Sequence, residues 1–356
     1  MRDLLHVGRL VTLVKNWGKT VIGLAAAATS PVRAELGRSF VVFVYHDVSD
    51  APSPFSRDHG LAVSVQQFTR QIQDIASMFH VISLDELLAG RVPRRAALLT
   101  FDDGFLGVVR HALPILRGLG VPSTIFLNMA PVRGEPFWAA RVTYLCHHME
   151  RFLEFLAEQK GREALVDPHL ACSPAVIRAW EGRHGDQYLE ALPAYAGRLV
   201  SADDLAAVDG DPLVTFGSHA YHHYNLLELT DAEVEADVEA NAAALSAYRS
   251  TRAVFAFPFG VPGRSFAQRH VDLLLRMGYE RLFTGLSLLN QEIEVPVLHR
   301  LSLTGWHDRR SRIWYQMARA AFDGRVAQRK TGSSRLPGRD APVLAARGTS
   351  MRSARP

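Results

Sequence analysis

The sequence predicts an α/β protein built from parallel strand–helix–strand units. Short apolar runs that read as buried strands alternate with segments in which apolar residues recur at helical spacing. Strand, helix and strand follow one another at the pace of parallel βαβ units. Polar residues stand directly after several of these strands, at the position where α/β enzymes keep their catalytic groups.

Each element is predicted from its local pattern. Ser64 is a candidate N-cap for a helix over 64–78, residues 83–86 form a capping box that opens a short helix, and Gly120 closes a helix over 106–119. Further helices are expected at 230–248, 266–277 and 306–322. The apolar runs predict strands at 40–45, 80–83, 98–101, 122–128, 213–217, 253–259, 282–284 and 296–303.

The alternation of strands and helices is interrupted between residues 131 and 211. Segments 142–158 and 189–199 are helical in pattern, and no strong strand occurs. A helical insertion between two core strands is most often a lid or a substrate-binding cap, and the alternative is decoration. Phe137 and Trp138 at its start either anchor the insertion, which we favour, or stack on a sugar.

Composition bounds the class of protein. With 356 residues, 48% apolar and 21% charged, the chain has material for a large core. The formal net charge of the whole chain is +4. Residues 325–356 hold eight Lys/Arg and one acid, so this tail has a charge of +7 and the rest of the chain a charge of −3. A basic body built for nucleic acid is not indicated. The two cysteines could form at most one disulfide, which suits a reducing compartment without excluding the periplasm.

The two ends of the chain differ from the middle. Basic residues precede a short apolar stretch at 21–28, which is marginal for a signal peptide. We favour the alternative, a basic amphipathic helix lying on a membrane surface, and hence a cytoplasmic or inner-membrane-associated protein, with the periplasm or secretion left open. No apolar run approaches the ~18 residues needed to span a bilayer. The predicted organisation is 1–37 as this segment, 38–322 as the enzyme domain and 323–356 as a disordered basic tail. The oligomeric state is not predicted.

The strand that ends at Phe101 is followed by two adjacent carboxylates, Asp102 and Asp103. Burying two carboxylates side by side is costly unless a cation or a proton offsets the charge. Within a regular strand the two would point to opposite faces, but Gly104 allows a bend that brings both into one pocket. The alternative is a simple turn, since Asp-Gly is a common turn dipeptide.

Three histidines follow the strand at 213–217. His219 and His223 are four residues apart, so on a helical turn their imidazoles would share one face and could bind one metal ion. His222 also faces His219 at i,i+3 spacing. Packing does not explain three histidines in five residues after a buried strand, and we therefore predict a metal site. His46, which follows the first strand, would by itself most often be structural.

Three motifs in order resemble those of the polysaccharide deacetylases, also called NodB-homology or carbohydrate esterase family 4 enzymes. They are Thr100-Phe101-Asp102-Asp103-Gly104-Phe105, Ser218-His219-x-x-x-His223 and Phe257-Pro258-Phe259-Gly260. The resemblance covers about residues 38–305. It implies a distorted (β/α) barrel with fewer than eight regular units and a divalent metal, usually zinc, at the carboxyl ends of the strands.

Tyr45-His46-Asp47 and Phe255-Ala256-Phe257 make the chain most similar to members involved in exopolysaccharide and poly-N-acetylglucosamine export. The substrate that this implies is an N-acetylated glycan. Many members carry Arg where this chain has Ala256. That departure is the only support for a non-catalytic sugar-binding relative. A further alternative is a deacetylase of a lipid-linked or small amide or ester.

The resemblance also implies roles for single residues. The metal ligands are Asp103, His219 and His223, and Asp102 is the general base. Arg300 is expected to hold Asp102 in place of the missing Arg at 256. His46 is the expected general acid and His299 the second candidate. Contacts to the substrate or its oxyanion are expected from Phe105, Phe259 and Tyr221.

Overall fold

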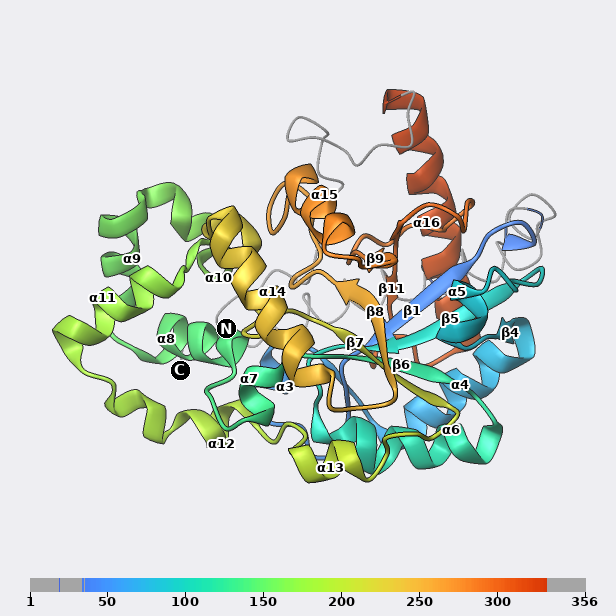
Figure 1. Ribbon diagram of the computed structural model, residues 1–356, viewed down its shortest axis with the longest axis horizontal. Coiled ribbons are helices and arrows are strands. Elements are labelled where there is room, and N and C mark those ends of the chain that lie inside the picture. The colour runs from blue at the N-terminus through green and yellow to red at the C-terminus, as the bar shows by residue number, and fades with distance from the viewer. Residues whose placement is uncertain (1–18, 20–33, 35, 332–356) are drawn as a thin grey trace, which may run out of the picture.

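A computed structural model describes residue 19, residue 34 and residues 36–331 (Figure 1). At its centre lies one parallel sheet in the order β10-β9-β8-β7-β6-β5-β1-β11, with β4 paired to β5 off this path. β2 (Asp47–Val48) and β3 (Ala62–Val63) form a separate parallel pair. The strands of the main sheet are β1 (Val41–Tyr45), β4 (His80–Val81), β5 (Ala96–Phe101), β6 (Ser123–Leu127), β7 (Val214–Ser218), β8 (Thr251–Ala256), β9 (Arg281–Phe283), β10 (Val297–Leu298) and β11 (Leu301–Ser302).

One short segment joins the two edges of this sheet. β10 pairs with β9 at one edge and β11 pairs with β1 at the other. Only His299 and Arg300 separate β10 from β11. The sheet therefore curls into a ring with its seam at these two residues, which confirms the distorted (β/α) barrel expected from the sequence.

The two faces of the strands contribute to different cores. Val42, Leu98, Phe126, Val254 and residues of β9 and β10 form one buried cluster, which fills the inside of the ring. The alternate residues of the same strands pack outward against helices. Because side-chain direction alternates along a strand, one further step past each strand end brings residues 46, 102 and 219 to the inner side. The barrel thus places these predicted site residues at the end where the strands have their carboxyl ends, here called the mouth.

Helices cover the outside of the ring. In α4 the side chain of Ser64 accepts a hydrogen bond from the Gln67 N–H, and Phe68, Ile72 and Ile75 are buried at helical spacing. The helices outside the insertion are α3 (Pro54–Asp58), α4 (Val65–Met78), α5 (Leu84–Leu88), α6 (Leu113–Leu119), α14 (Asp231–Leu245), α15 (Gln268–Arg276) and α16 (Arg310–Thr331), with a π-helical turn η1 (Val108–Ala112) before α6.

The elements between β6 and β7 are all helical. They are α7 (Met129–Val132), α8 (Trp138–His148), α9 (Phe152–Lys160), η2 (Arg162–Val166), α10 (Pro168–Ala171), α11 (Pro174–His184), η3 (Gln187–Glu190), α12 (Leu192–Ala196) and α13 (Ala202–Ala206). Of these, α8 to α11 project to one side of the barrel (Figure 1) and have their own core around Trp138, Phe152 and Trp180.

Several predicted boundaries were wrong. The helix expected over 142–158 is two helices, because Arg151 has φ 67°, a left-handed conformation that ends a right-handed helix. The helix expected over 189–199 is likewise η3 and α12. Strands β2 and β3 were missed, since two-residue strands carry no periodic signal.

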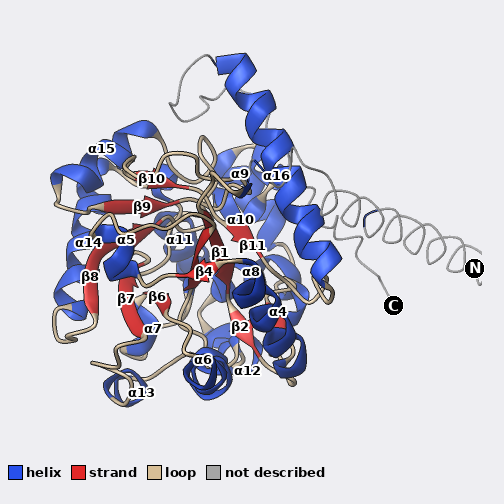
Figure 2. Ribbon diagram, turned by 90° about the vertical axis from the view of Figure 1, so that its right-hand side faces the viewer, coloured by secondary structure: helices blue, strands red, loops and turns tan. Residues whose placement is uncertain are grey.

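The two ends of the chain were treated as separate segments in the sequence. The disordered tail predicted from residue 323 begins too early, because α16 continues through Gly324 to Thr331 along one side of the molecule (Figure 2). A single Gly costs a helix only about 1 kcal/mol relative to Ala, and the residues after it are mostly helix formers. The amphipathic or signal-like segment and residues 332–356 lie outside the described residues. Within the described part, no helix is long and apolar enough to cross a membrane.

Candidate metal centre and active site

Asp102 and Asp103 leave the end of β5 in one turn. Asp103 has φ 70° and Gly104 has φ 74°. Two successive left-handed residues break the strand alternation, so Asp103 turns toward the same mouth that Asp102 already faces. A Cβ on Gly104 would lie 2.9 Å from Leu127 Cδ2, so glycine is favoured there by both its φ and the available space. Both carboxylates are buried.

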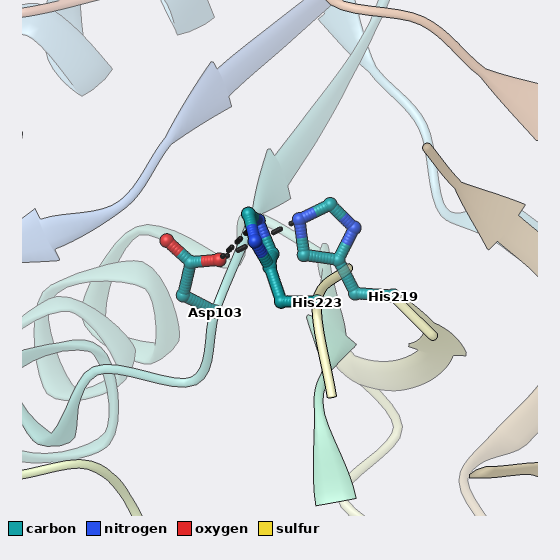
Figure 3. Close-up of side chains that lie close together, drawn as sticks. All are labelled: Asp103, His219 and His223. Atoms are coloured by element: carbon teal, nitrogen blue, oxygen red, sulfur yellow. Dashed lines mark ion pairs between the residues drawn. The ribbon is translucent and has the colours of Figure 1, made fainter. Parts of the chain in front are cut away.

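His219 and His223 lie in an irregular loop after β7 rather than on the helical turn that their spacing suggested. Ala220 has φ 61° and His223 has φ 69°, and neither conformation belongs to a right-handed helix. The loop still brings the two rings together, with centroids 4.8 Å apart. Their Nε2 atoms lie 3.5 Å and 3.4 Å from Asp103 Oδ1 (Figure 3).

These three side chains fit a divalent metal ion. Their ligand atoms all lie within 4.8 Å of one another. Ligands of a tetrahedral zinc at ~2.1 Å stand roughly 3.4 Å apart, which matches the two N–O separations. Asp103 Oδ1 has no hydrogen-bond partner within the described residues, although it is buried. His219 Nδ1 is hydrogen-bonded to the Ala256 carbonyl at 2.7 Å, which leaves Nε2 as the atom that faces Asp103.

The pKa shifts of the three groups also favour a bound cation. Burial and then the charge of Asp102 raise the pKa of Asp103 well above its ordinary value. Burial lowers the pKa of His219, and burial together with His219 lowers that of His223. Neutral imidazoles are the form that binds metal, and a cation would offset the cost of ionising Asp103.

Asp102 is held by Arg300 from the seam of the barrel. Arg300 donates to both carboxylate oxygens, Nη1 to Oδ1 at 2.6 Å and Nη2 to Oδ2 at 2.8 Å, and its Nε donates to the Thr284 carbonyl at 3.0 Å. Burial opposes ionisation of Asp102, but the guanidinium and the neighbouring imidazoles outweigh it and lower the pKa to about 2. Arg300 thus makes the contact expected of it, and Asp102 is ionised at neutral pH.

The two candidate acids are placed differently. Burial lowers the pKa of His46 to about 4, and the next influences on that pKa are Asp102, which raises it, and Arg300, which lowers it. His46 therefore shares the mouth with the carboxylates. His299 Nδ1 is instead within hydrogen-bond distance of Thr284 Oγ1 at 2.9 Å, and the His299 backbone N–H donates to Asn290. Its lowered pKa follows from burial alone. Of the two, only His46 has Asp102 and Arg300 among the charges that act on its pKa.

The three predicted contact residues have different surroundings. The Phe259 ring meets the His223 ring edge-on, with centroids 4.8 Å apart. The Phe105 side chain is buried against Phe55 and Phe137, which leaves its backbone for a contact. The Tyr221 hydroxyl donates to Glu135 Oε1 at 3.0 Å, so it is engaged with the start of the insertion.

The chain was compared with protein-family models, with curated proteins and with solved structures. No protein-family model and no curated protein matches the chain. IcaB from Ammonifex degensii superposes with a TM-score of 0.50 at 21% identity, over 78% of this chain and 97% of its own. The Streptococcus pyogenes deacetylase PplD, solved in complex with acetate, gives 0.51 at 13% identity over 78% and 98%. BC0361, a polysaccharide deacetylase from Bacillus cereus, gives 0.51 at 12% identity over 78% and 69%.

The fold is that of the polysaccharide deacetylases. The resemblance inferred from three short motifs is therefore confirmed for the architecture that carries them. At these identities the comparison establishes the fold alone, and the roles of single residues stay predictions.

Within this deacetylase fold, the loop of residues 219–225, here called the metal loop because it carries His219 and His223, is hydrogen-bonded to residues of α14 that the sequence analysis missed. Asp237 on α14 accepts the Tyr221 N–H at 2.9 Å and is hydrogen-bonded to His222 Nδ1. His222 therefore points to Asp237, with Glu135 3.4 Å from its Nε2, and away from the ligand set. One turn further along α14, Asn241 donates to the Leu127 carbonyl and to Ser218 Oγ. Buried polar residues four apart in an alanine-rich helix were the signal available in the sequence.

We expect Asp237→Asn to weaken metal binding by about 10–100-fold, the usual cost of losing a residue that orients a ligand loop. The substitution removes the charge that holds the Tyr221 amide and His222 between the two histidine ligands. Competition with a chromophoric chelator measures the affinity directly. Glu239→Gln, an exposed acid on the same helix, is the matched control. Equal affinity in the two variants would contradict a supporting role for Asp237.

Proposed function

We propose that the protein is a metal-dependent deacetylase that removes N-acetyl groups from N-acetylhexosamine residues of a polysaccharide or of its biosynthetic intermediate. The observation that carries the proposal is the meeting of Asp103, His219 and His223 beside an ionised Asp102 at one mouth of the barrel. PplD and BC0361, which are described as deacetylases, share the fold. We further propose zinc as the metal, because two imidazoles and one carboxylate make up a common catalytic zinc site.

A divalent ion held by these three residues would polarise the acetyl carbonyl and lower the pKa of the attacking water from 15.7 toward ~7. Asp102 stays ionised because Arg300 holds it, and its carboxylate accepts the proton of that water. The same bidentate contact fixes the direction in which the carboxylate points. Asp102 and Arg300 thus position one proton acceptor at the mouth.

The acetamide oxygen gains negative charge during attack. The Phe105 N–H donates no hydrogen bond within the described part of the chain, and it follows Asp103 and Gly104 in the same turn. It is therefore placed to donate to that oxygen. The Phe137 and Phe259 rings both contact the His223 ring, with centroids 5.9 Å and 4.8 Å away, and place apolar surface beside the ligand set.

The amine must be protonated before it can leave. His46 is neutral at pH 7 in the resting site, since its pKa is about 4. Negative charge on the tetrahedral intermediate raises that pKa by favouring the imidazolium. His46 then takes up a proton from solvent and delivers it to the departing nitrogen, while Asp102 returns the proton of the attacking water to solvent. Without the protonation of the nitrogen the intermediate returns to the amide.

The test is acetate release from N-acetylglucosamine oligomers by zinc-loaded protein, measured by an enzyme-coupled assay for free acetate. We expect release by the wild type and a loss of most of it after Asp102→Asn. Absence of release from oligomers, with zinc shown to be bound, would overturn the polymer substrate. Release from a lipid-linked N-acetylhexosamine in the same panel would then identify the intermediate as the substrate.

A further inference from the structure

The two cysteines of the chain meet inside the helical insertion. Cys146 belongs to α8, and Cys172 directly follows α10. Both are buried and unbridged, and interaction with the Cys146 thiol is the largest cause of the raised pKa of the Cys172 thiol. Both belong to the insertion core, together with Trp138 and Trp180. No cation ligand set includes them among the described residues.

We propose that Cys146 and Cys172 form an intramolecular disulfide that joins α8 to α10 when the protein meets an oxidising thiol–disulfide couple. The bond would close a loop over α9, η2 and α10. The inference concerns the insertion and does not depend on the proposed deacetylation.

The chemistry balances with a small disulfide such as oxidised glutathione. One cysteine thiolate attacks a sulfur of the oxidant, releases one glutathione thiolate and forms a mixed disulfide. The second cysteine thiolate then attacks the protein sulfur and releases the other glutathione. The two cysteines lose two protons and two electrons, and the oxidant is reduced to two thiols.

Burial determines which sulfur reacts first and when. Cys146 is 9% exposed and Cys172 is 1% exposed, so Cys146 is the accessible attacking group. The interaction with Cys146 and burial raise the pKa of the Cys172 thiol, so its thiolate is rare in the folded insertion. The bond is therefore expected to form during folding, or on transient opening of α8 from α10.

The position of the pair gives the bond a structural consequence. The Asn225 side chain donates to the Leu170 carbonyl at 2.6 Å, so α10 contacts the metal loop next to Cys172. At the start of α8, the Trp138 ring meets the Tyr224 ring edge-on, with centroids 4.6 Å apart. A bond between α8 and α10 would hold both contacts in place at once.

The full chain is refolded in a glutathione redox buffer, in parallel with reducing buffer, and analysed by intact mass and by thiol titration after denaturation. The oxidised monomer is expected to be lighter by two hydrogen atoms and to carry no titratable thiol. Peptide mapping should recover residues 146 and 172 in one linked fragment. The oxidised protein should also show a higher Tm and slower proteolysis between α8 and α11.

Cys146→Ala and Cys172→Ala control for folding, since each can be compared with the reduced wild type by Tm. Each should fold with a Tm somewhat below that of the reduced wild type, because a buried sulfur is removed, and should show no rise in Tm on oxidation. Retention of two free thiols in the folded, oxidised wild type would overturn the proposal. So would a stable glutathione adduct at Cys146 or a disulfide-linked dimer as the main product.

Discussion

Asp102→Asn is expected to lower acetate release by the metal-loaded protein by about 10²–10⁴-fold while the metal stays bound. The substitution leaves the three metal ligands and nearly the same side-chain shape, but an amide cannot accept the proton of the attacking water. Asp102 is ionised in the native site, so its negative charge is lost together with its basicity. Turnover is measured at saturating substrate, and bound zinc is measured by elemental analysis of the same sample.

Two further measurements make this result specific. The variant leaves the Arg300 guanidinium without its counter-charge, so its Tm is recorded to separate lost chemistry from partial unfolding. Asp211→Asn serves as the matched control, because it breaks an Asp–Arg pair with Arg117 outside the barrel mouth. We expect that control to keep both activity and zinc. An Asp102→Asn protein with wild-type turnover would contradict the role of general base.

Much of the barrel could be predicted because its strands are apolar runs of the right length, each followed by polar residues. Asp102 and Asp103 stand out because two carboxylates after a buried strand need a physical explanation. The shape of the metal loop could not be predicted, since Ala220 and His223 take left-handed conformations that neither residue type signals. The spacing of His219 and His223 pointed to two rings that the structure does bring together, although they lie in an irregular loop and not on the helical turn that the spacing suggested.

Other features depend on tertiary context. Asp237 resembles any other acid of an acidic helix until the fold places it behind Tyr221 and His222. The different surroundings of His46 and His299 could not be predicted either. Both follow apolar residues near a strand, and only the side-chain environment separates a ring at the mouth from one packed on Thr284.

Arg300→Met is expected to destabilise the fold by about 3–5 kcal/mol, the cost of leaving a buried carboxylate without its partner. Arg300 is 2% exposed and donates three hydrogen bonds, two to Asp102 and one to the Thr284 carbonyl at the barrel seam. Urea unfolding at pH 7 measures the loss. The matched control is Arg252→Met, which breaks a partly exposed pair with Asp85, and for which at most about 1 kcal/mol is expected.

The same substitution should change how stability depends on pH. The pKa of Asp102 is about 2 in the folded protein and 3.8 without the fold. Ionised Asp102 therefore favours the native state above pH 4, and this contribution is lost as the pH falls toward 2. Arg300→Met removes the main cause of the lowered pKa and leaves burial, which raises the pKa. Protonation of Asp102 then relieves the uncompensated carboxylate of the variant, so the variant should lose less stability than the wild type as the pH falls from about 5 to 2. Arg300→Lys keeps the charge but not the paired hydrogen bonds, and its loss of stability should lie between the two. If Arg300→Met and the wild type lost the same stability, the guanidinium would not be what keeps Asp102 ionised.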